Sequence, residues 1–532
     1  MSEMQGRMKK EGFLPLSKKN SSFSQKAETR EVLNGAGHFM NEQVFNASAS
    51  LPEPFTQEQI EAARVDAAEY TLLHRIPREC AKIKGFAGQQ LRRVMLHGAS
   101  IVFFTPGYEG KRFIYERARE LGVKAVIIDQ YGSWAESLVD DHIITKFIGM
   151  DLHRDSEVVF RDALAQIEAL SLDPLLDFRR PAGVCTFCEL SVPIVARLAE
   201  ALGLPGPSSA AVDTARDKHR TRGAMVAAGL PSPACFRIDT AADLGAASEA
   251  VGFPAVLKPL SGAASLGVMK VGSKDELVRC YDEVMTEMRS TIVSSGALVK
   301  TAAGAPASTQ SIVFLLEEYL DGIEVDVDVV MAEGLATYAA VVDNGPTAEP
   351  YFAETWGIFP SRLPEATQVE LRKLAVDALQ ACGFDCGVFH VELKNTTRGP
   401  RLIEINARMG GGQVRSTHLL TNGVDLVEET LFTCVGIPCA PHVERRLPAV
   451  AYNYVTAPQS GVIGDIEESI ARTAAEPDVI YAKALVRPGD RICGPRDGLP
   501  TWVADIMVSK NSNQEALDYV LKLSTDLDIP LV

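Results

Sequence analysis

Two short apolar segments carry polar residues whose types suit the binding of a metal ion and a phosphate. Read as strands with a period of two, residues 387–394 and 402–409 each place their polar residues on one face, namely His390, Glu392, Glu404, Asn406 and Arg408. Mg²⁺ prefers carboxylate and amide oxygens, so Glu392, Glu404 and Asn406 are predicted to hold Mg²⁺, or Mn²⁺ in its place, against nucleotide phosphates. The guanidinium of Arg408 is predicted to contact the transferred phosphoryl group.

The opposite faces of these segments are apolar and predict a hairpin that rests on the core. The expected core residues are Phe389, Val391, Leu393, Ile403 and Ile405. The alternative interpretation of the polar face is a solvated surface with an incidental ion pair. The glycine triplet 410–412 is predicted to open a helix whose free N–H groups, with Arg415, cradle an anion. Its alternative interpretation is a flexible turn.

A lysine stands directly before a loop of small residues. The apolar run 255–257 predicts a strand that delivers Lys258 and ends at Pro259. The following loop is made of small residues, among them Ser261, Gly262, Ser265 and Gly267. Backbone amides of such a loop can approach phosphates closely, although a plain turn is the alternative. No GxxxxGK[ST] occurs in the chain, so this loop is not a Walker A loop.

A third cluster joins an apolar strand to paired acids and a glycine turn. It predicts an adenosine site made of Glu317, Glu318, Tyr319, Leu320 and Glu324. Glu317 can accept a hydrogen bond from an exocyclic amine, and the backbone at Glu318 and Leu320 can read a purine edge. Glu324 can accept from two ribose hydroxyls.

Two further acids, Asp326 and Asp328, follow Glu324 and alternate with valines. A strand that alternates acids with valines is typical of a sheet with one face in water. We therefore expect Asp326 and Asp328 to lie on a solvated strand face.

The elements that must position these residues can be read along the chain. Strands are expected at 101–105, 123–129 and 183–187, and helices at 108–121 and 191–202. Strands alternating with helices predict a parallel, doubly wound sheet. A Pro/Gly linker at 204–209 forms the first boundary, and Asp217 is predicted to cap a helix that runs to Ala228. Two more helices are expected at 365–381 and 513–523.

Composition restricts the function further. The chain has 532 residues, a net charge of −16 and 46% hydrophobic residues, which fits three or four globular units. The negative balance argues against a nucleic-acid partner, and no apolar run is long enough for a membrane span. The start has no apolar segment of a secretory signal, and the ten scattered cysteines suggest reduced thiols, so a cytoplasmic location is expected.

These clusters, in this order, resemble the ATP-grasp superfamily over about residues 90 to 532. Local stretches such as residues 185–193, 343–347 and 404–411 resemble carnosine synthase and related ATP-dependent amino-acid ligases most closely. The resemblance implies an α/β and α+β fold in four parts. They are a disordered tail 1–50, a Rossmann-like domain 51–206, a two-lobed ATP-grasp domain 207–440 with its small lobe at about 232–320, and a lid-like α+β domain 441–532.

Carried over residue by residue, the resemblance implies that Lys218 and Lys258 bind nucleotide phosphates. It implies an adenosine site at Glu317, Leu320 and Glu324, and it implies Glu392, Glu404 and Asn406 as metal ligands with Arg408 beside the phosphoryl group. The implied reaction transfers the γ-phosphoryl group of ATP to a carboxylate, and an amine then attacks the acyl phosphate. Glu354 is hypothesised to bind or deprotonate the amine, and Arg415 to hold a substrate carboxylate.

The expected partners are therefore ATP, a small carboxylate and an amine that is a second amino acid, with a homodimer left open. Two other functions remain as alternatives. One is an ATP-grasp carboxylase or nucleotide-biosynthesis ligase, and the other is a catalytically inactive, ATP-binding regulator.

Overall fold

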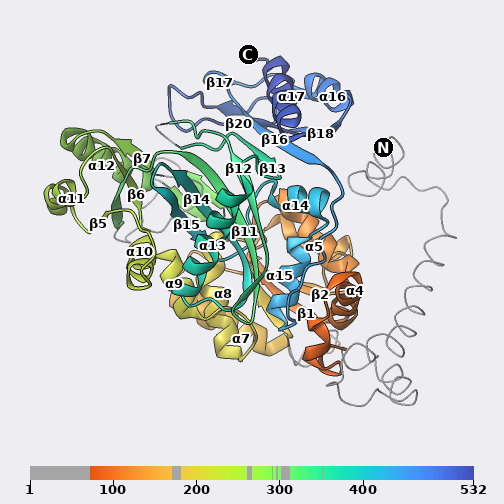
Figure 1. Ribbon diagram of the computed structural model, residues 1–532. Helices are drawn as coiled ribbons and strands as arrows, with labels where there is room; N and C mark the ends of the chain where they lie inside the picture. The colour runs from red at the N-terminus through yellow and green to blue at the C-terminus, as the bar shows by residue number, and fades with distance from the viewer. Residues whose placement is uncertain are drawn as a thin grey trace, which may run out of the picture. The chain divides into compact units, whose positions relative to one another are not determined.

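The computed structural model describes residues 72–170, 181–260, 267–289, 291–294, 297–300, 312–349 and 352–532 (Figure 1). Contacts along the chain separate two compact units, Met1–Cys80 and Ala81–Val532. The described residues of the first unit form the 3₁₀ helix η2 (Leu72–His74) and the start of η3 (Arg78–Lys82). The tail predicted for residues 1–50 lies outside the described residues.

The first sheet of the second unit has four parallel strands in the order β3-β2-β1-β4. The strands are β1 (Ser100–Phe104), β2 (Lys124–Gln130), β3 (Lys146–Met150) and β4 (Gly183–Cys185). Every residue of β1 is buried, which is typical of a strand covered on both faces. Helices α7 (Ser156–Ala169) and α8 (Val192–Leu202) pack against this sheet through one apolar core. The predicted strands and helices of this region are present, with ends that differ by a few residues.

Further helices complete this part of the chain. They are α4 (Gly85–Leu96), η4 (Glu109–Lys111), α5 (Arg112–Glu120), η5 (Trp134–Glu136), α6 (Ser137–Asp140) and η7 (Glu189–Ser191). The helix predicted at 108–121 thus begins as a 3₁₀ turn and continues as α5. Helix α8 ends where Gly203 adopts a left-handed backbone conformation, with φ of 60°.

The second sheet is antiparallel and also has four strands, in the order β5-β10-β6-β7. The strands are β5 (Cys235–Ile238), β6 (Ala255–Pro259), β7 (Met269–Val271) and β10 (Phe314–Glu318). Helices η8 (Ala241–Asp243), α11 (Leu244–Val251) and α12 (Lys274–Arg289) belong to the same segment, as does the hairpin β8 (Thr291–Ser294) and β9 (Ala297–Lys300). This segment corresponds to the predicted small lobe and lies at the left of Figure 1.

The third sheet has eight strands in the order β15-β14-β11-β12-β13-β16-β20-β18, and each neighbouring pair is antiparallel. Five strands come from the predicted ATP-grasp part, namely β11 (Ile323–Ala332), β12 (Leu335–Asn344), β13 (Trp356–Phe359), β14 (Gly387–Thr396) and β15 (Gly399–Asn406). Three come from the C-terminal part, namely β16 (Ala449–Thr456), β18 (Val479–Ala484) and β20 (Trp502–Lys510).

The eight-stranded sheet crosses the boundary that the sequence predicts at residue 440. Backbone pairing between β13 and β16 joins Trp356 to Asn453 and Ile358 to Ala451. Two separate apolar cores nevertheless lie along the sheet, one built on β11, β14 and α13, the other on β16, β20 and α17. The C-terminal part therefore has its own core but shares its sheet with the preceding part.

Helices cover both parts of this sheet. They are α9 (Ser209–Arg216), α10 (Lys218–Ala227), α13 (Glu365–Ala381), α14 (Val414–Asn422), α15 (Leu426–Cys434), α16 (Glu467–Ala475) and α17 (Asn513–Asp526). The strands β17 (Gly461–Val462) and β19 (Arg491–Ile492) form a small separate pair. Asp217 caps α10 as predicted, since its side chain accepts a hydrogen bond from the backbone N–H of Arg220 at 3.0 Å.

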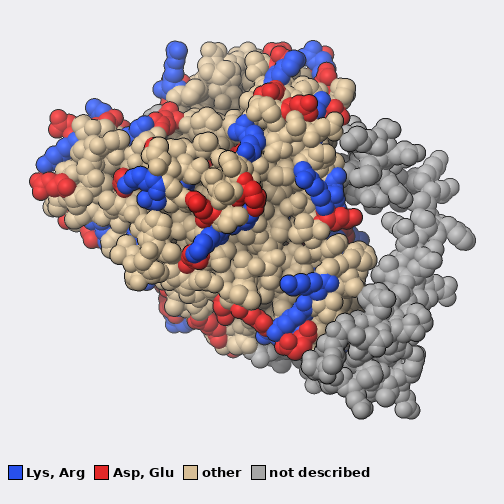
Figure 2. Space-filling model, viewed as in Figure 1, with Lys and Arg blue, Asp and Glu red and all other residues tan. Residues whose placement is uncertain are grey.

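The helices, cysteines and surface charges of the described residues are those of a globular protein. None of their helices combines the length and apolar character that crossing a membrane would require. All ten cysteines are free thiols. Figure 2 shows acidic and basic side chains interspersed on the visible face.

Candidate active site

The hairpin β14–β15 brings the predicted metal ligands together. Glu392 pairs with Glu404, and His390 pairs with Asn406, so their side chains share one face as the sequence predicts. A bulge between Glu392 and Leu393 shifts the register, so that Leu393 pairs with Leu402. The expectation that Ile403 is a core residue is wrong, because the bulge puts Leu402 into the core in its place.

Hydrogen bonds and ion pairs connect the polar face of the hairpin. The Asn406 amide donates to a Glu392 oxygen at 3.0 Å, and Lys218 Nζ lies 3.0 Å from a Glu404 oxygen. Burial and the carboxylate of Glu404 raise the pKa of Glu392. Burial also acts to raise the pKa of Glu404, but Lys218 outweighs it and lowers this pKa. Two adjacent carboxylates with opposed pKa shifts are a pair that a divalent cation would stabilise.

This donor set fits Mg²⁺, which takes carboxylate and amide oxygens and keeps several waters or phosphate oxygens. Among the residues that the structure describes, no three His, Cys, Asp or Glu side chains form a metal cage. The predicted set of Glu392, Glu404 and Asn406 contains two such residues and one amide, so bound phosphates would have to complete the coordination. Its role as a metal site remains a prediction.

The predicted phosphate ligand Lys258 and the predicted adenosine ligand Glu317 form an ion pair with each other. They lie on adjacent strands β6 and β10, and both are buried. Arg222 of α10 donates from Nε to the other Glu317 oxygen at 2.5 Å. Burial opposes ionisation of Glu317, but Arg222 and Lys258 lower its pKa to about 2. Glu317 is therefore a buried anion that positions Lys258.

The sequence analysis missed Arg222. It stands four residues after Lys218 on the same helix, so the two side chains share a face of α10. Arg222 also donates to the backbone oxygen of Ile403 at 2.6 Å, which ties α10 to the hairpin. The i, i+4 spacing of two cations was the signal that could have identified it. Of the predicted loop, Gly267 has φ of +73°, while Ser261, Gly262 and Ser265 lie outside the described residues.

The predicted adenosine residues follow the end of β10. The backbone N–H of Glu318 is already bonded to Ala234 O at 2.9 Å, and the oxygen of Leu320 accepts from Lys394 at 3.3 Å. Tyr319 donates its hydroxyl to Glu349 at 2.8 Å. Burial and then Asp326 raise the pKa of Glu324 to about 7. These residues lie at the end of β10, in the turn that follows it and at the start of β11, and their role as an adenosine site remains a prediction.

The expectation of a solvated face for Asp326 and Asp328 is wrong. Asp326 is 6% exposed and Asp328 is fully buried. The central strand β11 lies between β12 and β14, and His418 of α14 packs over this face. His418 stands 90 residues after Asp328 in the sequence, so the alternation within β11 could not reveal this cover.

Asp328 forms the centre of a buried polar network. It accepts from His390 Nδ1 at 2.9 Å and from His418 Nε2 at 2.7 Å. His418 Nδ1 in turn lies 2.7 Å from the hydroxyl of Tyr338, which accepts from Asn422 at 3.1 Å. Burial acts to lower the pKa of His390, but Asp326 and Asp328 raise it to about 10. The network fixes His390 beneath the predicted metal ligands.

Arg408 lies at the end of the hairpin, between two other parts of the site. Its Nη2 donates to Asn406 Oδ1 at 3.3 Å, and its Nε lies 2.6 Å from a Glu189 oxygen. Glu189 also accepts from Arg216 Nη1 at 2.8 Å and is buried. Glu189, which the sequence analysis missed, thus orients the arginine predicted to contact the phosphoryl group.

The two predicted substrate residues occupy different settings. Arg415 donates to both oxygens of the buried Asp425, at 2.8 and 2.9 Å, so holding a substrate carboxylate would require it to leave this pair. Glu354 is exposed on the loop before β13. Crowding by surrounding protein atoms and the carboxylate of Asp326 raise its pKa. The roles of both residues remain predictions.

The ion pair of Asp425 predicts a pH-dependent contribution to stability. Burial opposes its ionisation, but Arg415 lowers its pKa from 3.8 to about 2. An acid whose pKa is lowered by folding stabilises the fold at every pH above its pKa in the unfolded chain. The contribution is therefore lost as the pH falls from about 4 to about 2. The size is about 2 kcal/mol. The free energies of unfolding of wild type and Asp425→Asn should differ at about pH 6, and the difference should shrink as the pH falls toward about 2. A constant difference would contradict the assignment.

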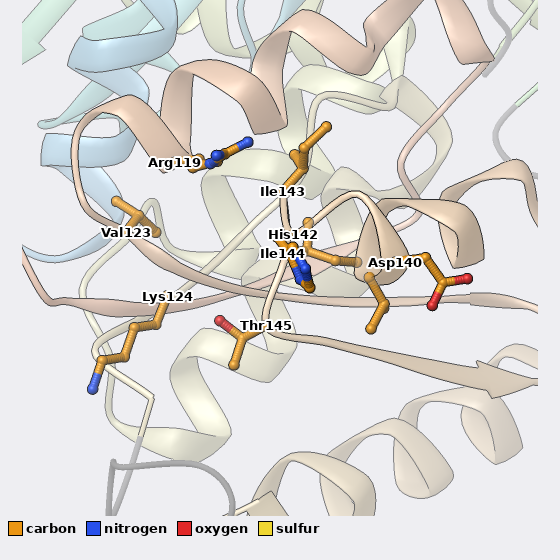
Figure 3. A pocket seen from close by; sticks show the side chains of 9 residues that line it. Arg119, Val123, Lys124, Asp140, His142, Ile143, Ile144 and Thr145 are labelled. Atoms are coloured by element: carbon orange, nitrogen blue, oxygen red, sulfur yellow. The ribbon is translucent and has the colours of Figure 1, made fainter. Parts of the chain in front are cut away.

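A hollow among the described residues lies elsewhere. It has a volume of about 550 Å³ and is lined by Arg119, Val123, Lys124, Val139, Asp140, His142, Ile143, Ile144 and Thr145 (Figure 3). It opens at the amino ends of β2 and β3, and none of the predicted site residues lines it. Ligands of parallel sheets bind at the opposite, carboxyl ends, so this hollow is not assigned to the active site.

Comparison with known proteins agrees with this fold. Residues 251–417 match an ATP-grasp domain, and residues 115–206 match an ATP-grasp N-terminal domain. The fold is also that of the L-amino acid ligase from Bacillus licheniformis, with a TM-score of 0.64, 22% identity and coverage of 82% of this chain and 99% of that one. The chain therefore contains an ATP-grasp domain preceded by an ATP-grasp N-terminal domain, with a mixed α/β fold.

Within the ATP-grasp proteins, the chain is related to carnosine synthase. It is 35% identical over 352 residues to carnosine synthase 1 of Gallus gallus, covering 65% of this chain and 36% of that protein. It is 30% identical over 374 residues to the Homo sapiens protein, covering 67% and 43%. Alanine–anticapsin ligase of Bacillus subtilis is 29% identical over 262 residues, covering 48% and 54%. The chain thus spans less than half the length of the carnosine synthases.

Proposed function

We propose that the protein is an ATP-dependent carboxylate–amine ligase that joins an amino acid, or a similar carboxylate, to a second amino acid. The products are an amide, ADP and phosphate. The observation that carries the proposal is the pairing of Glu392 with Glu404 beside Asn406 and Arg408, within reach of Lys218. The names of the relatives, carnosine synthase and alanine–anticapsin ligase, support an amino acid on each side of the new bond.

The residues divide the chemistry by position and charge. Lys218 and Lys258 bind the phosphates of ATP, and Arg408 stabilises the charge on the γ-phosphoryl group as it moves to the carboxylate. Glu392, Glu404 and Asn406 would hold Mg²⁺, which would supply positive charge to neutralise phosphate oxygens. Glu354 holds or deprotonates the amine that attacks the acyl phosphate, and release of phosphate leaves the amide.

The finer domain assignments belong to the same proposal. The parallel sheet β1–β4 serves as a Rossmann-like domain before the ATP-grasp domain, and residues 441–532 act as a lid. A lid would keep water from hydrolysing the acyl phosphate. The cytoplasmic location and a homodimer also remain proposals.

The test is an ADP-release assay over a grid of amino-acid pairs, with mass spectrometry of the products. We expect ADP and a dipeptide for at least one pair, and loss of both with Glu404→Ala. Glu370→Ala, which changes an exposed residue of α13, is the matched control and should keep full activity. ADP release with bicarbonate or a phosphorylated amine would instead support a carboxylase or nucleotide-biosynthesis ligase. No ADP release with any pair would support a catalytically inactive ATP-binding regulator.

A further inference from the structure

The parallel sheet contains a point where its strand order reverses. Strand β1 lies between β2 and β4, so the loops that leave β1 and β4 at their carboxyl ends depart from neighbouring strands in the middle of the sheet. In open α/β sheets, ligands bind in the crevice at such a point. The loops are residues 105–111 and 186–191, and none of the sequence-predicted site residues belongs to them.

The two loops are fixed against each other. Thr105 Oγ1 lies 2.6 Å from Ser191 Oγ, and both side chains are buried. Thr105 has φ of +55°, a left-handed conformation that is costly for a β-branched residue. Strain of this kind persists where the surrounding structure imposes it, and it gathers at binding sites. The crevice is therefore a preformed feature.

Lys111 lies across this crevice. Its Nζ donates to the backbone oxygen of Phe187 at 2.6 Å, so a residue that follows β1 is bound to the loop that follows β4. Gly107 makes room for it, because a Cβ atom at that position would stand 2.8 Å from Lys111 Cδ. An ammonium group has three donors, so two remain for a ligand after the bond to Phe187.

Positive charge gathers next to Lys111. Arg408 and Arg216 both contact the buried Glu189, which belongs to the same loop as Phe187. Burial lowers the pKa of Lys111, and its charge interacts with Arg408 and Glu189. Glu404 and Glu354 add negative charge near Arg216 and Arg408. An anion bound by Lys111 in the crevice would lie beside Arg408, the arginine assigned to the phosphoryl group.

We propose that Lys111, together with Arg408, binds the carboxylate of the acyl donor at the crevice between β1 and β4. This inference rests on the proposed function, since the carboxylate that meets the γ-phosphoryl group must lie beside Arg408. Lys111 is then a substrate-binding residue supplied by the segment that precedes the ATP-grasp domain. Lys111 then favours acyl donors that place a free carboxylate in the crevice.

The kinetic test measures KM for the acyl donor, the amine and ATP in the full chain with Lys111→Met. Loss of one charge-assisted hydrogen bond predicts a KM for the acyl donor about 10 to 100 times higher. We expect KM for ATP to stay within about twofold, and Lys111→Arg to recover part of the loss. Lys84→Met, a change of an exposed lysine before α4, is the matched control. Unchanged KM for the acyl donor, or an equal rise for all three substrates, would overturn the proposal.

A binding test separates this proposal from the proposed function. Thermal shift of the wild-type protein with ADP and Mg²⁺ is measured with each of the common amino acids, and then repeated with Lys111→Met. A shift in the wild type that disappears in the variant supports the carboxylate site, even where no turnover is found. A shift that persists in the variant, or no shift in the wild type, overturns it.

Discussion

Arg408→Ala is expected to lower the rate of ADP release by about 10³-fold while the protein stays folded. The guanidinium lies between the predicted metal ligand Asn406 and the loop residue Glu189, so it is fixed before substrate arrives. An arginine held in place beside a transferring phosphoryl group stabilises the transition state more than the bound substrate. The loss should therefore be found in kcat, with KM for ATP nearly unchanged.

The control for Arg408 is Arg401→Ala on β15, the strand that precedes Arg408. Arg401 donates to the backbone oxygens of Arg398 and Pro400, at the end of β15 away from the metal ligands. Its loss should change turnover by less than about twofold, since such surface changes are usually small in their effects. Single-turnover measurements of ADP formation compare the two variants. Retention of wild-type turnover in Arg408→Ala would remove this arginine from the phosphoryl site.

Asp328→Ala is expected to lower the free energy of unfolding by about 3 to 5 kcal/mol. Asp328 is fully buried and accepts from both His390 and His418. Removing one member of a buried ionic network leaves its partners with uncompensated charge or unpaired donors. The measurement is the shift in the urea unfolding midpoint at constant slope.

Two further variants define the effect of Asp328. Asp328→Asn keeps an acceptor oxygen and should lose less stability than Asp328→Ala. Asp213→Ala changes an exposed residue of α9 and should shift stability by no more than about 0.5 kcal/mol. Equal midpoints for Asp328→Ala and Asp213→Ala would show that the network does not stabilise the fold.

The sequence predicted what local periodicity determines. Alternation alone placed Glu392 and Glu404 on one face of a hairpin, and the cap at Asp217 set the start of α10. The prediction for Ile403 was wrong because of the bulge after Glu392. The extra residue of a bulge changes which residues of the two strands are paired, and composition does not reveal it.

The remaining residues of the site depend on contacts between distant parts of the chain. Asp326 and Asp328 are buried because His418 of α14 packs over their face of β11. The residue pattern of β11 itself does not predict that a helix covers this face. Lys111 and Glu189 lie in loops that meet only once the strands β1 and β4 are neighbours. Residues such as these are predictable only when the topology is known.

The continuous eight-stranded sheet limits how this protein can be divided. If the chain were cut near residue 440, β13 would lose the partner to which it pairs from Trp356 to Phe359. A row of unpaired N–H and C=O groups would then face water beside Ile358, which now packs in the C-terminal core. Such an edge recruits other chains and promotes aggregation. The C-terminal part thus supplies three strands that complete the sheet. A protein shortened at this point is expected to be insoluble, although it would keep every residue proposed to bind the nucleotide.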